Sequence, residues 1–472
     1  MVLMAKESSA IREVTEDSPA SKKEETVVFK DKKCVVQKVQ ISGLKKTKSD
    51  FVLPELEQVM QSSTFVTAYQ SALDCKKKLL NLGIFDHVDI IMDTTSHYKG
   101  NKVPNGIQIL FRVKEKRSLT GEARTEMSNN DQPQWVIRLM SPNVFGRGEM
   151  LSATFSRKLG SESVSGNGFY SPHDFSFAAS KPFKNGSLFR MSILQDRQDC
   201  PWNSTSLTVR GGQLEYQFPL FNNTHTLAYH AHWRDLASSN NTTAFPIREN
   251  FGHTAKSSLL HSVTMDRTDD KILPSKGYMI KMTEELAGVG IGSKYIKENM
   301  ELQFHKTLFR RLTLSAGFRG GFIVPFDNEQ TQIPDRFFIG GPLTLRGFDM
   351  NRAGPQVDGD FLGGNCYWVA GLHAYLPLPF YWRNFGKGSW LDGFRIHGFF
   401  NAGNVLTFDN NQMIRNQLSC LAENIRTSYG VGLVYNFMRG ARIELNFCVP
   451  SSVVAGDKVC DGVQFGIGLS TV

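Results

Sequence analysis

Hydrophobic and polar residues alternate with a period of two from residue 118 to the end of the chain. One clear run places Leu312, Leu314 and Phe322 on one face, whereas Thr313 and Arg319 lie on the other. Because successive side chains of a strand point to opposite faces, these runs predict strands with one apolar face. Sixteen such segments begin near residues 119, 134, 149, 172, 187, 204, 225, 256, 277, 295, 312, 365, 394, 425, 441 and 462.

The number and spacing of these strands favour a closed barrel over a soluble sandwich. Residues 119–472 allow about 22 residues for each strand with its loop, which suits membrane strands of roughly 9 to 11 residues. A sandwich also alternates, but it repeats every roughly 8 to 12 residues. Open edges on so many strands would also favour aggregation. We therefore expect a β fold, with a transmembrane antiparallel barrel of about 16 strands over residues 118–472.

Residues 34–117 follow a different pattern. One alternating run is followed by two helical segments and two further alternating runs, which predicts the order β-α-α-β-β. Thr67 and Gln70 fit a capping box for the second helix, and Gly83 fits its C-terminal stop. Residues 1–33 mix acidic and basic side chains without an apolar segment. They predict a disordered tail and argue against a secretory signal or a cleaved mitochondrial presequence.

Composition adds little beyond this division. The chain has 54 Lys and Arg against 45 Asp and Glu, and the net charge of +9 is spread without a polybasic block. We expect no nucleic-acid partner. The mean hydropathy of -0.27 is what an apolar outer wall averaged with a polar lumen would give. The longest uncharged stretch, Asn365–Trp382, contains His373 and two prolines, which a membrane helix rarely carries together.

Motifs for enzyme chemistry are absent from the sequence. There is no P-loop, GxSxG or HExxH pattern, so we expect no enzyme activity, cofactor or metal site. Seven cysteines are scattered without a CxxC pair, which favours free thiols over a zinc site or a disulfide framework. Cys448 and Cys460 are the one pair left open as a disulfide.

Several phrases resemble a known family. The β-α-α-β-β order with LLNLGIFDHVDI and ILFRVKEK resembles a POTRA domain. A long segment before the predicted twelfth strand contains FFIGGPLTLRGF, which resembles the signature of the outer-membrane insertase and translocase superfamily. Together with GPQVDGDFLGGNCYW, FFNAGN and CDGVQFGIGL, these phrases are similar to the central-barrel family of the sorting and assembly machinery in the mitochondrial outer membrane.

The resemblance implies a loop, residues 325–364, that folds into the barrel lumen and docks its Arg-Gly-Phe tip on the inner wall. His373 and Asn401 stand where bacterial relatives have acidic groups, and we expect them to form part of this wall. Docking would then use neutral acceptors, tyrosines, or the acids Asp349, Asp358 or Asp360. The motif residues are Gly340, Gly341, Arg346, Gly347 and Phe348.

The resemblance also implies a function. The family inserts β-barrel precursors into the mitochondrial outer membrane without ATP, by strand pairing at a seam between the first and last barrel strands. Its N-terminal domain lies in the intermembrane space. The expected partners are β-barrel precursors, peripheral sorting and assembly subunits, inner-membrane contact-site proteins and the lipid bilayer. The seam residues would be Leu119, Gly121, Ala123, Thr125, Gly462, Gln464, Gly466 and Gly468.

Other interpretations stay open at this point. A protein-translocating channel of the same superfamily would share the barrel and the motif, although such pores usually carry more than one POTRA domain. A soluble β-rich binding protein would share only the alternation. The C-terminus resembles a mitochondrial β-signal at Gln464, Gly466 and Leu469, but Thr471 occupies its final apolar place and Val472 follows.

Overall fold

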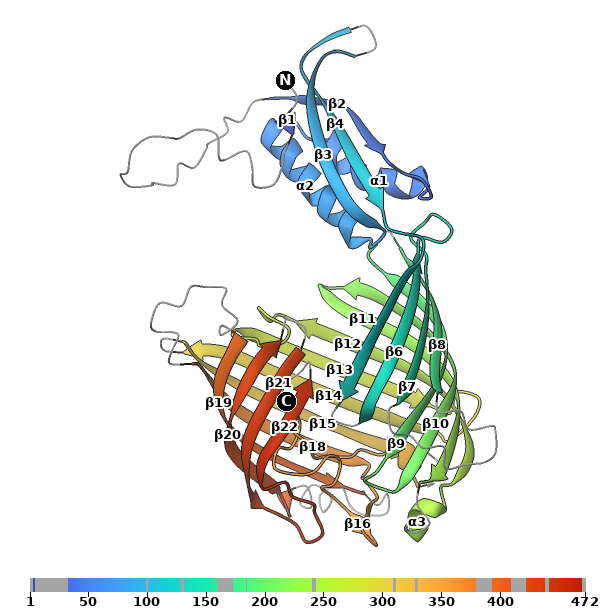
Figure 1. Ribbon diagram of the computed structural model, residues 1–472, viewed down its shortest axis with the longest axis vertical. Helices are drawn as coiled ribbons and strands as arrows, with labels where there is room; N and C mark the ends of the chain where they lie inside the picture. Colours follow the sequence, from blue (N-terminus) through green and yellow to red (C-terminus); the bar gives the residue numbers. More distant parts are fainter. Residues whose placement is uncertain are drawn as a thin grey trace. The chain divides into compact units, whose positions relative to one another are not determined.

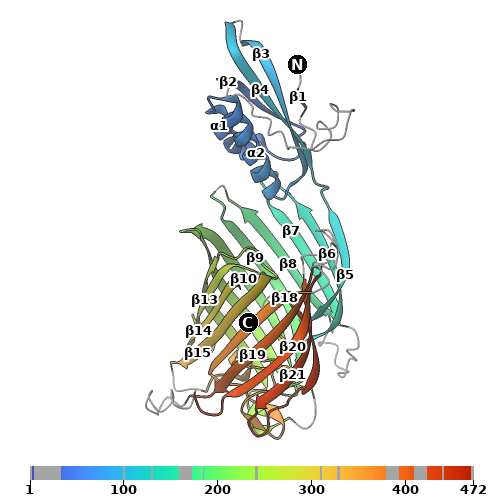
Figure 2. The same cartoon turned by 90° about the vertical axis from the view of Figure 1, so that its left-hand side faces the viewer.

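The computed structural model divides the chain into two compact units, drawn in Figure 1 and, turned by 90°, in Figure 2. Unit 1 comprises Met1–Glu122, Leu139–Ser152 and Ala179–Pro182, and unit 2 comprises Ala123–Arg138, Ala153–Ala178 and Phe183–Val472. The structure describes residues 3–4, 33–98, 101–128, 131–158, 173–183, 185–239, 243–308, 311–326, 330–378, 393–408, 422–437 and 441–468.

The N-terminal domain in unit 1 has the predicted β-α-α-β-β order. Strand β4 is the middle of the sheet, with β2 parallel and β3 antiparallel to it. Two helices pack on the sheet and bury Val52, Leu79 and Phe111 in one core. The elements are β2 (Val35–Ser42), α1 (Ser49–Met60), α2 (Phe65–Asn81), β3 (Phe85–Tyr98) and β4 (Asn101–Glu115).

Helix α2 begins earlier than predicted. Its N-cap is Thr64, and the side chains of Thr64 and Thr67 cap each other's backbone N–H groups, so the Thr67–Gln70 box was wrong. The earlier start lets Phe65 pack against the core. Gly83 follows the helix with φ of 72°, which confirms the predicted stop. In the predicted tail, Leu3–Met4 (β1) pair with β3; the rest of its first 32 residues lies outside the described ranges.

A carboxylate at the end of β4 orders the segment between β2 and α1. Glu115 accepts hydrogen bonds from the backbone N–H groups of Lys45, Lys46 and Thr47 at 2.9–3.0 Å and from the Thr47 hydroxyl. Asn143, in the turn between β6 (Asp131–Pro142) and β7 (Met150–Lys158), donates to Thr47 Oγ1 at 2.7 Å within the same unit. Burial alone would raise the pKa of Glu115, but the hydrogen bonds of Thr47, Lys45 and Lys46 hold it below its usual value.

The remaining strands form one 16-stranded antiparallel sheet in sequence order, from β5 at one end to β22 at the other. Figures 1 and 2 show its tilted strands curving into a barrel. The prediction of sixteen strands is confirmed. They are β5 (Thr120–Ser128), β6 (Asp131–Pro142), β7 (Met150–Lys158), β8 (His173–Pro182), β9 (Leu188–Cys200), β10 (Thr205–Leu220), β11 (Asn223–Ser238), β12 (Gly252–Asp266), β13 (Gly277–Ala287), β14 (Tyr295–Leu308), β15 (Leu312–Pro325), β18 (Cys366–Pro377), β19 (Phe394–Leu406), β20 (Arg426–Phe437), β21 (Ala441–Ser452) and β22 (Gly462–Gly468).

The barrel wall buries its polar side chains and exposes its apolar ones, which is the reverse of a soluble sheet. On β21, Arg442 and Glu444 are fully buried, whereas Leu445 and Phe447 are 48% and 53% exposed. Polar side chains thus point to the lumen and apolar ones point outward, as in a membrane-spanning barrel. No helix in the described ranges is long and apolar enough to span a membrane. Cys448 and Cys460 are both free thiols, so the disulfide left open above does not form.

Candidate functional site

The segment between β15 and β18, residues 326–365, is called the lumen loop here. Its tip reverses direction through Gly340, Gly341 and Gly347, which all have positive φ. A Cβ at Gly340 would collide with the carbonyl oxygen of Asp349, so the turn needs glycine there. The described part of the loop also contains η2 (Ile333–Asp335), β16 (Gln356–Val357) and β17 (Asp360–Phe361).

The guanidinium of Arg346 is fully buried and is neutralised by Glu444 of β21. Nε lies 3.1 Å and Nη2 3.0 Å from Oε2 of that carboxylate, and Nη2 lies 3.2 Å from Oε1. Glu444 also accepts from Arg442 and, at 2.9 Å, from Asn446 Nδ2. The Phe399 ring lies 5.4 Å from the Arg346 guanidinium carbon. One carboxylate therefore serves two buried cations, and we call Arg346, Arg442, Glu444 and Asn446 the tip anchor.

Glu444 was not predicted from the sequence as the partner of Arg346. The expected partners of Arg346 were neutral acceptors, tyrosines, or the acids Asp349, Asp358 or Asp360. Within the described residues, none of these three acids accepts a hydrogen bond from Arg346. Asp349 lies 3.9 Å from Arg352, and Asp360 accepts from Ser204 and Ala244. Glu444 is 98 residues from Arg346, so only strand order brings them together. Its signal was a run of alternating polar residues in β21, which includes Arg442, Glu444 and Asn446.

The two expected wall residues lie beside the tip anchor. With the Asn401 amide oriented to satisfy both its ends, its oxygen accepts from the backbone N–H and Nη1 of Arg346 at 3.3 Å each. His373 is 3% exposed, and its ring stacks on that of His397 with the ring centroids 6.0 Å apart. Neither of its ring nitrogens has a hydrogen-bond partner among the described residues. Both neutral side chains thus line the anchor, and Glu444 supplies the negative charge.

The tip is also fastened to the last strand. Gln464 of β22 accepts from the Gly347 backbone N–H at 3.0 Å and donates from Nε2 to the Phe348 carbonyl at 2.9 Å. The loop before β22 adds backbone hydrogen bonds from Cys460 N to Gly347 O at 2.9 Å and from Asp349 N to Lys458 O at 3.0 Å. The Arg-Gly-Phe tip is therefore bound to the β21–β22 hairpin by side chains and by backbone.

A second cluster fixes the start of the lumen loop. Asp335 of η2 is 3% exposed. Its Oδ1 receives Arg234 Nη1 at 2.8 Å, Lys256 Nζ at 3.0 Å and the Tyr295 hydroxyl at 2.8 Å. Lys297 Nζ donates to the Asp335 carbonyl at 2.9 Å. We call this group the base anchor; it was not predicted from the sequence.

The expected seam residues lie in the two end strands of the sheet or, for Leu119, directly before the first one. Leu119 precedes β5 and is 63% exposed, whereas Gly121, Ala123 and Thr125 lie on the exposed face of that strand. In β22, Gln464 is buried at 7% exposure, unlike the apolar seam neighbours Val463 and Phe465 at 66% and 53%. Gly466 and Gly468 share the inward face with Gln464, Gly462 begins the strand, and Leu469, Thr471 and Val472 lie outside the described residues.

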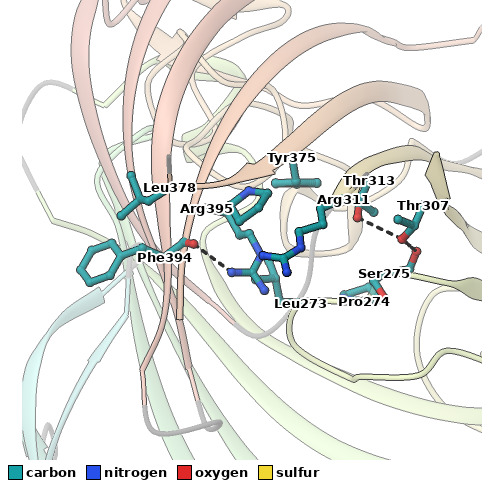
Figure 3. Close-up of a pocket in the computed structure, with 11 residues that line it drawn as sticks. Leu273, Pro274, Ser275, Thr307, Arg311, Thr313, Tyr375, Leu378, Phe394 and Arg395 are labelled. Atoms are coloured by element: carbon teal, nitrogen blue, oxygen red, sulfur yellow. Dashed lines mark hydrogen bonds between the residues drawn. The ribbon is translucent and has the colours of Figure 1, made fainter. Parts of the chain in front are cut away.

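Two cavities open beside these clusters. One of about 470 Å³ adjoins the base anchor at Arg234, Lys256 and Asp335. Figure 3 shows the other, of about 370 Å³, where Arg311 and Arg395 line the space with Tyr375. The Tyr375 hydroxyl accepts from Arg442 Nη2 at 2.7 Å, which links this cavity to the tip anchor. Both cavities have charged walls, and within the described part of the chain no group of side chains suits a metal ion.

Comparison with known proteins agrees with this architecture. The Omp85 superfamily domain matches residues 143–471. The sorting and assembly machinery component 50 homolog B of Xenopus laevis is 39% identical over 97% of this chain and 94% of the relative, and the human homolog is 38% identical over the same shares. A SAM50-like protein of Drosophila melanogaster is 31% identical over 93% of this chain and 95% of the relative.

The fold has a solved counterpart. The structure of BamA from Haemophilus ducreyi lacking POTRA domains 1–3 matches with a TM-score of 0.71 and 16% identity, over 92% of this chain and 84% of that one. The barrel, the FFIGGPLTLRGF loop and the end-to-end similarity lead to one assignment: the chain belongs to the Omp85 superfamily and, within it, to the family of sorting and assembly machinery component 50 homologs.

Proposed function

We propose that this protein inserts β-barrel precursors into the mitochondrial outer membrane by strand pairing at a seam between β5 and β22. The last strand of the precursor pairs with β5, so its backbone N–H and C=O groups are satisfied before they meet lipid. An unpaired backbone group in the bilayer core costs several kcal/mol, so strand pairing avoids this cost and the proposed route uses no ATP. The proposal needs no catalytic residue, cofactor or metal.

One observation carries this proposal. The first and last strands occupy the ends of the sheet order, and both carry small residues where strands usually carry bulky ones. β5 has Gly121 and Ala123, and β22 has Gly462, Gly466 and Gly468 in seven residues. Cross-strand side-chain pairs supply much of the stability of a sheet, so a joint made from such strands is weaker than its neighbours.

Similarity to known proteins supports an assembly role. The names of the relatives describe components of a sorting and assembly machinery. By the same similarity we place the barrel in the mitochondrial outer membrane and the N-terminal domain in the intermembrane space. There the domain receives precursors and supports their release, while peripheral machinery subunits and inner-membrane contact-site proteins bind the complex.

A lockable seam tests the proposal. Thr125→Cys is combined in turn with Val463→Cys, Phe465→Cys or Ile467→Cys, because these side chains lie on the outer faces of β5 and β22. Oxidation of the pair that crosslinks should stop the assembly of radiolabelled barrel precursors in isolated mitochondria, and reduction should restore it. The matched control is Leu445→Cys with Phe465→Cys, which are direct partners in the β21–β22 ladder and should crosslink without loss of assembly.

The outcomes separate the proposal from its competitors. Full precursor assembly with an oxidised seam would overturn strand pairing at β5. Loss of assembly in the Leu445–Phe465 control as well would mean that any rigid crosslink disables the barrel. A protein-translocating channel would instead lose transport of its cargo while barrel precursors assemble normally, so helical and barrel outer-membrane proteins are followed in parallel.

A further inference from the structure

We infer that Gly466 and Gly468 of β22 form a socket for Pro342 and Leu343 of the lumen loop, and that this contact latches the last strand from inside the barrel. The inference rests on the proposed function for its meaning, because it says what holds one side of the seam in place. It changes the interpretation of the two glycines: they make room for the loop, besides weakening the joint.

The socket is defined by what a side chain at each glycine would meet. A Cβ at Gly466 would lie 2.8 Å from Pro342 Cβ, and a Cβ at Gly468 would collide with Leu343 Cδ1. Neither glycine has a positive φ among the backbone exceptions of the chain. The absence of a side chain is therefore required by the close approach of the loop and not by the backbone conformation.

The socket continues the tip anchor across one ladder. Gly468 pairs with Arg442, Gly466 with Glu444, and Gln464 with Asn446 in the β21–β22 register. The inner face of the hairpin therefore has a charged strand beside a strand with little side chain. Arg346 reaches Glu444 on the first, and Pro342 and Leu343 fill the space on the second.

Gln464 completes the latch. Its amide binds both the N–H of Gly347 and the carbonyl of Phe348, and its oxygen also lies 3.6 Å from Cys448 Sγ. A side chain that satisfies one donor and one acceptor of the same loop tip fixes the position of that tip along β22. Because these atoms are buried, breaking either hydrogen bond leaves a polar group without water to replace it.

The latch determines which side of the seam moves. The lumen loop, β21 and β22 are joined by a buried ion pair, a filled socket and backbone hydrogen bonds, so they behave as one body. The seam then opens by separation of β5 from this latched hairpin, and loosening the latch lets β22 leave its register.

The test adds a side chain to the socket and then removes the loop atoms with which it collides. Gly468→Ala should displace the loop, and the added Leu343→Ala should restore docking, because the second change removes the atom that the new methyl group meets. Gln464→Ala removes two buried hydrogen bonds and should shift docking about tenfold. Gly398→Ala is the matched control, since its Cβ would meet only Gly430 O at 3.9 Å on a neighbouring strand.

Two measurements are made on the full-length protein in mitochondria. Trypsin cleavage after Arg346 and Arg352 reports docking of the loop, and the yield of the dominant Thr125 to β22 disulfide reports the register of the seam. In Gly468→Ala and Gln464→Ala, we expect faster cleavage and about a tenfold lower yield of that disulfide. Gly468→Ala with Leu343→Ala should return toward wild type, and Gly398→Ala should change neither.

Each result decides the inference. Unchanged cleavage in Gly468→Ala, or no recovery in the double variant, would overturn the socket. Faster cleavage with an unchanged seam disulfide would overturn the latch on β22. The proposed function fails separately: if latch variants shift both readouts while an oxidised seam still permits precursor assembly, the latch stands and the insertion route does not.

Discussion

The two anchors of the lumen loop use the same chemistry with opposite signs. At the tip anchor the loop supplies the cation Arg346, and the wall supplies Glu444 with a second cation, Arg442. At the base anchor the loop supplies the anion Asp335, and the wall supplies Arg234 and Lys256. Both are buried, but among the described residues only the base anchor offers one of its cations a second carboxylate, because Lys256 also pairs with Glu285.

This second carboxylate sets the difference between the anchors. At the base, Lys256 lies 2.8 Å from Glu285, and Arg234 Nη2 donates to Gln332 at 2.7 Å. At the tip, a single carboxylate is the anion for two guanidinium groups that are both fully buried. A buried ion pair adds little over an apolar contact, but losing one partner leaves an uncompensated charge. The tip anchor is therefore the more fragile of the two.

Loss of the shared carboxylate should have the largest effect. Glu444→Gln keeps the shape but leaves Arg346 and Arg442 without an anion, so we expect the free energy of unfolding to fall by about 3–5 kcal/mol. Urea unfolding of the barrel in lipid, followed by its heat-dependent shift on gels, measures this. Glu301→Gln is the control, because Glu301 is a partly buried partner of Arg319 across the β14–β15 ladder and makes no ion pair with Arg346 or Arg442 among the described residues. If both variants lower the free energy of unfolding equally, the tip anchor is no more sensitive than an ordinary ion pair of the wall.

Loss of the base carboxylate should have a smaller effect. Asp335→Asn removes the charge between Arg234 and Lys256, but Gln332 and Glu285 remain, so we expect a loss of about 1–3 kcal/mol. The same unfolding assay applies. Asp349→Asn is the control, since that carboxylate is 41% exposed and its ion pair with Arg352 is long, at 3.9 Å. If Asp335→Asn lowers the free energy of unfolding as much as Glu444→Gln does, then Glu285 and Gln332 do not compensate for the lost carboxylate.

The smallest effect is expected outside the barrel, at Glu115. Its lowered pKa means that its stabilisation is present above the pKa of the unfolded chain and is lost as pH falls through the folded value. Because the carboxylate is only partly buried, we expect less than about 1 kcal/mol. Hydrogen-exchange protection of the Lys45–Thr47 amides at pH 7 and pH 4 measures it. Glu115→Gln should remove the pH dependence; a persistent pH dependence in that variant would assign it to another group.

The fold was largely predictable because its signal is local. Alternation such as Leu445, Asn446, Phe447 and Cys448 depends only on which face of a strand meets lipid, so strand number and order followed from the sequence. The helix start at Thr64 was missed because core packing of Phe65 decided it.

The sequence by itself determined the small N-terminal domain and the sixteen strands, and its family motif marked the loop tip with glycines at 340, 341 and 347. Only the tertiary structure decided what that tip binds. Glu444, Gln464 and the glycines at 466 and 468 become one site because antiparallel register sets them side by side on β21 and β22. Such contacts join residues about a hundred positions apart, and no local pattern encodes a contact between an inward-folded loop and the strands that its tip reaches.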